Sequence, residues 1–188
     1  MNNDMELSIL STGISEPVNI AEVRDFIGYP STNQDTVIKK MIITAREWLE
    51  EYCAISIVNK QYKAYFEKAD ALNGWYELPV SPVLSTPALV VAVRGVTIDF
   101  EQMGLNIVRV RPYSTYGTIG VGSTGVNWYM EVTFNAGAAN NTADEIIRKI
   151  VATMFNARTD GAGEGVQMGR LPYDTLRLIS AINKNTGL

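Results

Sequence analysis

A glycine-rich run is the first feature of the sequence with the spacing of a chemical site. Residues 117–125 read GTIGVGSTG, and Gly120, Gly122 and Gly125 have the spacing of a nucleotide phosphate loop. In a dinucleotide-binding fold a helix follows these glycines, and its N-terminal N–H groups bind the pyrophosphate. Here residues 127–134 alternate between apolar and polar side chains, which predicts a strand. The pattern favours a loop between strands over a phosphate site.

Protein kinases also place a glycine-rich loop between two strands, but they need an H-R-D catalytic loop as well. The chain has no histidine and is 188 residues long, which excludes a two-lobed kinase. A serine nucleophile would lack its histidine base, and no G-x-S-x-G motif occurs. A small nucleotide-binding enzyme remains the weaker alternative function.

Acidic residues and one cysteine are the remaining candidates for chemistry. Zinc sites are excluded without histidine, and the acidic residues show no calcium-loop spacing. Glu47, Glu50 and Glu51 are expected on the solvated side of an amphipathic helix, although paired carboxylates from distant segments stay open. Cys53 lies among apolar residues and is expected in the core. We therefore predict no catalytic, cofactor-binding or metal-binding residue, and no cofactor.

Two helices are predicted in the first part of the chain. Asn19 followed by Glu22 reads as a capping box, which opens a short helix over 20–27. A longer helix over 35–53 has apolar residues at alternating steps of four and three. These residues are Ile38, Ile42, Ala45, Leu49 and Tyr52. A second apolar line contains Val37, Met41 and Trp48. The widened face either packs into the domain's own core or partly faces another copy of the protein.

The middle of the chain, residues 56–135, has the pattern of strands. Residues 57–66 are rich in β-branched and aromatic side chains, 88–93 are apolar, and 105–111 alternate. Prolines within 78–87 are expected at edges or crossings, because proline cannot donate a ladder hydrogen bond. A long loop is expected over 112–126. Its candidate contact residues with a neighbouring copy are Tyr113 and Tyr116.

Helical spacing returns after the strands. Thr142 and Glu145 read as a second capping box, and a helix is predicted over 143–158. A glycine-rich linker follows, and beyond it the sequence predicts a final amphipathic helix. The candidate partner-binding residues there are Leu171, Tyr173, Leu176, Ile179 and Ile182. A helix on such a linker can dock on its own domain or in a groove of a partner, and both remain open.

The order of elements predicts an α+β fold, with helices at both ends packed around a β-rich middle region and a C-terminal amphipathic helix on a glycine-rich linker. One domain is expected over 1–158, with helices 20–27, 35–53 and 143–158 and the β-rich region 56–135. Residues 159–188 then form the linker and a docking helix. A composition of 46% hydrophobic and 19% charged residues is typical of a globular protein.

Charge and composition favour a protein that acts by contact. The net charge of −4 argues against a general basic surface for DNA or an anionic membrane. The acidic N-terminus lacks a secretory signal pattern, and no apolar run is long enough to cross a bilayer. We expect a protein used in the cytoplasm or carried out of it inside something larger.

Five segments occur in an order that resembles the head-tail connector (adaptor) proteins of tailed bacteriophages. They are EPVNIAEV at 16–23, IITAREWLEEY at 42–52, ELPVSPV at 77–83, VTFNAG at 132–137 and IIRKIVATMFNAR at 146–158. The resemblance covers residues 16–158. The chain departs from it at Thr142-Ala143-Asp144, where the family often has a proline, and in its long loop over 112–126.

The resemblance implies a structural virion protein of the phage neck, without catalytic activity. It implies a homo-oligomeric ring of about twelve copies, which joins the portal protein to a downstream neck or tail protein. Double-stranded DNA would pass through the ring without specific binding, and no membrane is involved. The protein would assemble in the host cytoplasm and reside in the virion neck. Another neck component, such as a stopper or tail-completion protein, is the alternative.

Overall fold

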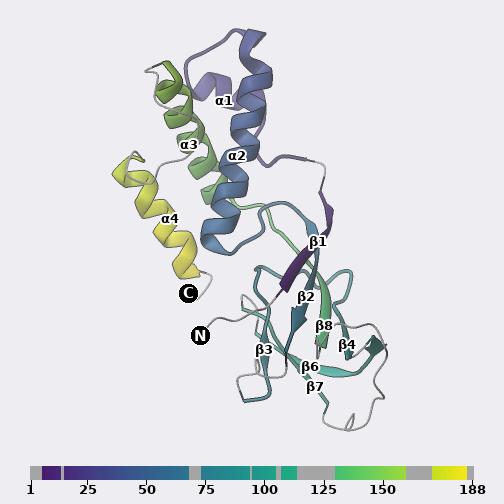
Figure 1. Ribbon diagram of the computed structural model, residues 1–188. Helices are drawn as coiled ribbons and strands as arrows, with labels where there is room; N and C mark the ends of the chain where they lie inside the picture. Colours follow the sequence, from purple (N-terminus) through teal and green to yellow (C-terminus); the bar gives the residue numbers. More distant parts are fainter. Residues whose placement is uncertain are drawn as a thin grey trace. The chain divides into compact units, whose positions relative to one another are not determined.

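The computed structural model describes residues 6–13, 15–67, 73–93, 95–104, 107–113, 130–159 and 171–185 (Figure 1). Helices and antiparallel sheets confirm the predicted α+β class. The chain forms two compact units, one from residues 1–13 and 59–137 and the other from 14–58 and 138–188. The first unit contains the strands, and the second contains the helices.

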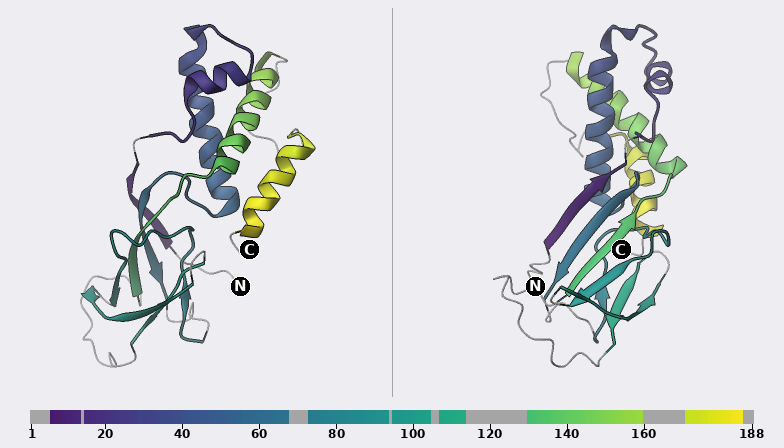
Figure 2. Two further views of the ribbon diagram at one scale, coloured as in Figure 1. Left: turned by 180° about the vertical axis from the view of Figure 1, so that it is seen from behind. Right: turned by 90° about the vertical axis from the view of Figure 1, so that its right-hand side faces the viewer.

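The main sheet of the first unit has five strands in the order β1-β2-β8-β4-β5 (Figure 2). These are β1 (Glu6–Thr12), β2 (Lys60–Phe66), β8 (Met130–Ala136), β4 (Val90–Val93) and β5 (Val96–Thr97). The central pair, β2 and β8, keeps one register from Lys60 opposite Ala136 to Phe66 opposite Met130. Buried and half-buried side chains alternate along β2, so every second residue faces the core.

A second sheet has three strands in the order β3-β7-β6. These are β3 (Tyr76–Glu77), β7 (Arg109–Pro112) and β6 (Phe100–Met103). Buried residues of both sheets form one apolar cluster, in which Phe66 lies 5.4 Å from Tyr76 between ring centroids. The proline-containing segment 78–87 contains no named strand, and an isolated bridge joins Val83 to Ala136.

The helical unit contains α1 (Ile20–Phe26), α2 (Asp35–Cys53), α3 (Asn141–Thr159) and α4 (Tyr173–Asn185), with a short 3-10 turn at Thr32–Gln34. One apolar cluster joins the helices, because each has residues spaced to face the same side. The fully or nearly fully buried members include Val23, Ile38, Ile42, Leu49, Ile146, Ile150 and Ile179. Helices α2 and α3 lie side by side, and α4 lies along α3 (Figure 1).

Asparagine side chains begin two of these helices. Asn19 Oδ1 accepts a hydrogen bond from Ala21 N at 2.9 Å. Asn140 Oδ1 accepts from Thr142 N at 2.9 Å and from Ala143 N at 3.3 Å. The capping box predicted at Thr142 is therefore wrong: Asn140 reaches the free N–H groups of the first turn, and Thr142 lies inside the helix.

Candidate functional site

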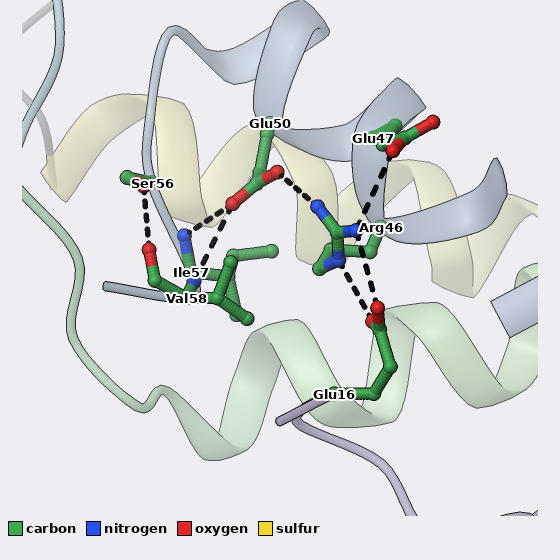
Figure 3. Close-up of polar contacts among 7 residues, drawn as sticks. All are labelled: Glu16, Arg46, Glu47, Glu50, Ser56, Ile57 and Val58. Atoms are coloured by element: carbon green, nitrogen blue, oxygen red, sulfur yellow. Dashed lines mark hydrogen bonds and ion pairs between the residues drawn. The ribbon is translucent and has the colours of Figure 1, made fainter. Parts of the chain in front are cut away.

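A buried ion-pair cluster lies on the C-terminal half of α2 (Figure 3). Arg46 Nη1 donates to Glu50 Oε2 at 2.7 Å, and Arg46 Nε donates to Glu16 Oε2 at 2.7 Å. Arg46 and Glu50 are only 4% and 6% exposed. Because an isolated buried charge is costly, each of these groups depends on the others for its place in the interior.

The second oxygen of Glu50 binds the backbone that follows α2. Glu50 Oε1 accepts from Ile57 N at 2.8 Å and from Val58 N at 3.4 Å. Ser56 Oγ donates to Val58 O at 2.8 Å in the same segment. The prediction that Glu50 lies on the solvated side of the helix is wrong, because the chain after α2 turns back and covers this flank. Glu47 and Glu51 are exposed, as predicted.

The cluster lies where the backbone of the helical unit continues into the other unit. The chain passes between the units at residues 13–14, 58–59 and 137–138. Glu16 closely follows the first passage, and Val58 immediately precedes the second. Ala138 N, just after the third, donates to Ser56 O at 3.3 Å. The cluster therefore holds the helical unit's end of these connections.

The charge on Arg46 is stable in this environment. Burial opposes the charge, but hydrogen bonds and Coulombic attraction from Glu16 and Glu50 outweigh it and raise the pKa of the guanidinium. The guanidinium thus stays protonated and binds the carboxylates of Glu16 and Glu50. This arrangement anchors the backbone that Glu50 binds.

The predicted subunit-contact residues of α2 are half-buried. Met41 and Trp48 pack against the helical core, and Val37 has similar intermediate exposure. Trp48 stacks on Tyr52, with ring centroids 5.3 Å apart and planes at 11°. The prediction that Tyr52 belongs to the core face is wrong, since it is 49% exposed. The aromatic pair thus forms a partly open apolar surface beside the core.

Cys53 is buried at the end of α2, as predicted. Desolvation raises the pKa of its thiol to about 11. Among the described residues, no group of three or more histidine, cysteine or acidic side chains is placed to hold a metal ion. In the same part of the chain, no helix has the length and apolar character of a membrane span.

The candidate partner-binding residues at the last helix fall into a buried group and an exposed residue. Leu171, Ile179 and Ile182 are buried in the helical core, and Leu176 packs partly against it. Tyr173 at the start of α4 is 83% exposed. An ion pair between Lys149 of α3 and Asp174 of α4 joins the two helices. The apolar face of α4 therefore packs on its own unit in this structure.

The remaining predicted contact residues lie at the end of β7 and beyond it. Tyr113 is exposed, at the end of the described segment 107–113. Tyr116 and the glycine-rich run 117–125 lie outside the described residues. Sequence analysis also missed β1 altogether, although Leu7 and Ile9 alternate with Ser8 in the pattern of a strand.

Comparisons with known proteins identify the fold. No protein-family model and no curated protein matches the sequence. A chain of the virion of a native gene transfer agent (GTA) particle is 17% identical, with a TM-score of 0.68 over 93% of each chain. The fold is that of a gene transfer agent chain.

Two further matches come from the necks of such particles. A chain in the neck of an empty GTA particle, computed with C6 symmetry, is 16% identical, with a TM-score of 0.67 over 94% of each chain. A chain in the neck of a native GTA particle, computed with C12 symmetry, is 16% identical, with a TM-score of 0.63 over 93% of this chain and 94% of that one. The likeness therefore extends across both units.

Proposed function

We propose that this chain is a structural neck protein of a tailed phage or phage-like particle, where it forms a ring that joins the portal to the tail. The observation that carries the proposal is the shared fold with chains of a gene transfer agent virion and of gene transfer agent necks, over 93% or more of both chains. The C12 symmetry of one such neck supports a ring of about twelve copies, which extends the channel for DNA. The role is mechanical and needs no catalytic group.

The charges of the protein suit a conduit for DNA. The chain has a net charge of −4, so its overall field repels a polyanion. In the β-rich unit, Arg109 Nη2 lies 2.8 Å from Glu77 Oε2, and Arg111 pairs with Glu101. Because carboxylates neutralise these arginines, they offer little attraction to phosphates. DNA would thus pass the ring without specific binding.

We assign portal binding to the exposed side of α4. The buried residues Leu171, Ile179 and Ile182 hold the helix on its own unit, whereas Tyr173 leaves most of its ring free for a partner. An amphipathic tyrosine is a common anchor in protein interfaces. The half-open pair of Trp48 and Tyr52 offers a second surface, suited to a neighbouring copy.

Electron microscopy of negatively stained samples tests the function directly. The full chain is mixed with the portal protein of the same particle, and each is also imaged alone. We expect rings seated on one end of the portal, even if the free chain stays monomeric. Absence of both rings and portal binding at high concentration would overturn the proposal. A stopper or tail-completion protein would fail to bind the portal directly and would need an intervening ring.

A thermal-shift measurement separates the enzymatic alternative. A nucleotide-binding protein is stabilised by its ligand, because the ligand binds only the folded state. We expect ATP, GTP and NAD to leave the midpoint of unfolding unchanged. A concentration-dependent rise with one of them would favour a nucleotide site instead.

A further inference from the structure

The outer edge of β1 carries few of the features that protect strand edges from other chains. Within the described residues, β1 pairs with β2 and stands at the end of the five-stranded sheet (Figure 2). Natural edge strands usually carry lysine, proline or inward-pointing charge, which prevents pairing with other chains. Apart from the charged Glu6 at its start, β1 contains none of these, since residues 7–12 read LSILST. Only a register shift between Ile9 and Ser11 interrupts the edge.

The apolar residues of β1 continue the core face of the sheet. Leu7 lies opposite Ala64, and Ile9 lies opposite Tyr62. Residues opposite one another on paired strands share a face. The buried residues of this face on β2 and β8 include Tyr62, Ala64, Val132 and Phe134. Leu7 and Ile9 are nevertheless 38% and 56% exposed. The core face therefore extends beyond the residues that cover it.

The opposite edge of the same sheet has a similar feature. Val96 of β5 lies opposite Val93, which lies opposite Met130 of β8. Val93 and Met130 are buried, so Val96 also belongs to the core face, yet it is 47% exposed. Both ends of one apolar face thus carry an incompletely covered side chain.

Strand direction decides how these edges can meet. Every neighbouring pair in the sheet is antiparallel, so the first and fifth strands, β1 and β5, run in the same direction. Copies in a ring meet through heterologous contacts, in which one surface of a copy touches a different surface of the next. A β1 edge would then meet a β5 edge in parallel orientation. A two-fold dimer would instead pair β1 with itself.

We propose that β1 of each copy packs against the β5 edge of the next copy, so that Leu7 and Ile9 cover the neighbour's Val96. This inference rests on the ring of the proposed function. The occupant is a second copy, because the C12 symmetry of one similar neck supports a ring, and neighbouring copies in a ring meet through two different surfaces. The exposed residues Leu7, Ile9 and Val96 are all apolar, so a contact between the two edges would bury apolar surface.

Disulfide crosslinking in assembled rings tests the contact. The full-length variant Ile9→Cys/Val96→Cys is mixed with portal and oxidised, and the products are separated by denaturing electrophoresis without reductant. We expect a ladder of covalent multimers, because each copy is linked to the next. The two single variants are the matched controls and should give no ladder. Cys53 is buried and should form no crosslink. Oxidation of the wild-type chain under the same conditions checks this.

A charge placed on the edge gives a second measurement. Ile9→Lys/Leu10→Lys should raise the concentration for half-maximal ring formation by about tenfold or more, because it removes apolar burial at each contact. Phe26→Lys is the control, since Phe26 is also exposed but belongs to α1. Circular dichroism verifies that each variant is folded.

The outcomes separate the inference from the function on which it rests. Rings on the portal without a ladder would overturn the β1–β5 contact and leave the connector function intact. A dimer from Ile9→Cys alone would overturn it in favour of two-fold pairing. If the wild-type chain forms no ring and binds no portal, the proposed function fails, and this inference fails with it.

Discussion

Arg46 and Glu50 lie one turn apart on α2 and share a 2.7 Å hydrogen bond, although both are almost completely buried. Glu50 also accepts two backbone N–H groups from the segment after the helix, and Arg46 binds Glu16 from the segment before α1. One pair thus connects α2 with the segment before α1 and with the segment that follows α2. The pair replaces the water that these polar groups would otherwise need.

Removing Arg46 should therefore destabilise the protein strongly. Arg46→Ala leaves Glu50 buried without its cation, and such losses typically cost about 3–5 kcal/mol of unfolding free energy. Urea denaturation followed by circular dichroism measures this. Lys40→Ala, an exposed basic residue on the same helix, is the matched control and should change stability by less than about 0.5 kcal/mol. Equal small effects of the two substitutions would contradict a structural role for the cluster.

The buried and exposed residues of α4 should respond differently to substitution. Ile179→Ser removes an apolar side chain that is 2% exposed, so we expect a loss of about 2–5 kcal/mol. Tyr173→Ser should leave unfolding nearly unchanged and weaken portal binding instead. Chemical denaturation and a portal pull-down measure the two effects. Unchanged portal binding by Tyr173→Ser would remove this residue from the proposed interface.

The ion pair between α3 and α4 predicts a dependence on pH. The hydrogen bond that Lys149 donates to Asp174 lowers the pKa of Asp174, and the same bond raises the pKa of Lys149. A lowered acid pKa stabilises the fold above the ordinary value of 3.8, and this stabilisation is lost as the pH falls through the folded-state value. A raised lysine pKa stabilises the fold below 10.5, and that part is lost as the pH rises through the folded-state value.

Asp174→Asn is the variant that tests this pair. Its stability should fall below that of the wild type at neutral pH, and the two should converge at acidic pH. High salt should also reduce the difference, because both side chains reach the surface. Thermal unfolding across a pH series measures it. A difference that persists unchanged at acidic pH would assign the effect to something other than the carboxylate charge.

Cys53 should be inert in the native protein. Its thiol is buried, and its pKa is raised to about 11, so little thiolate exists near neutral pH. We expect an aromatic disulfide reagent to label it only at the rate of unfolding, and denaturant should make the labelling immediate. Rapid labelling without denaturant would show that the end of α2 opens easily, and crosslinking experiments would then need Cys53→Ala.

Sequence periodicity predicted the helices well because their signal is local. The spacing of Ile38, Ile42 and Leu49 requires only neighbours on one helix, and α2 occupies the predicted residues 35–53. The alternation of Met130, Val132 and Phe134 likewise predicted the buried face of β8. The fold class followed from the order of these segments. The strand β1 was not predicted, since alternation is short there (Leu10 follows Ile9) and the strand is defined mainly by its pairing with β2.

By itself, then, the sequence determined which segments are helical, where the central buried strands lie, and that the chain lacks histidine chemistry. Tertiary structure decided what the faces of these helices and strands contact. Glu50 and Glu51 are adjacent acidic residues on one helix, but only Glu50 meets the backbone of Ile57 and is buried. Ile179 could face a partner or its own unit, and packing against the helical core decided this. The contacts of Ile179 join residues far apart along the chain, and the contact of Glu50 depends on how the chain turns after α2, so the periodicity of a single helix encodes neither.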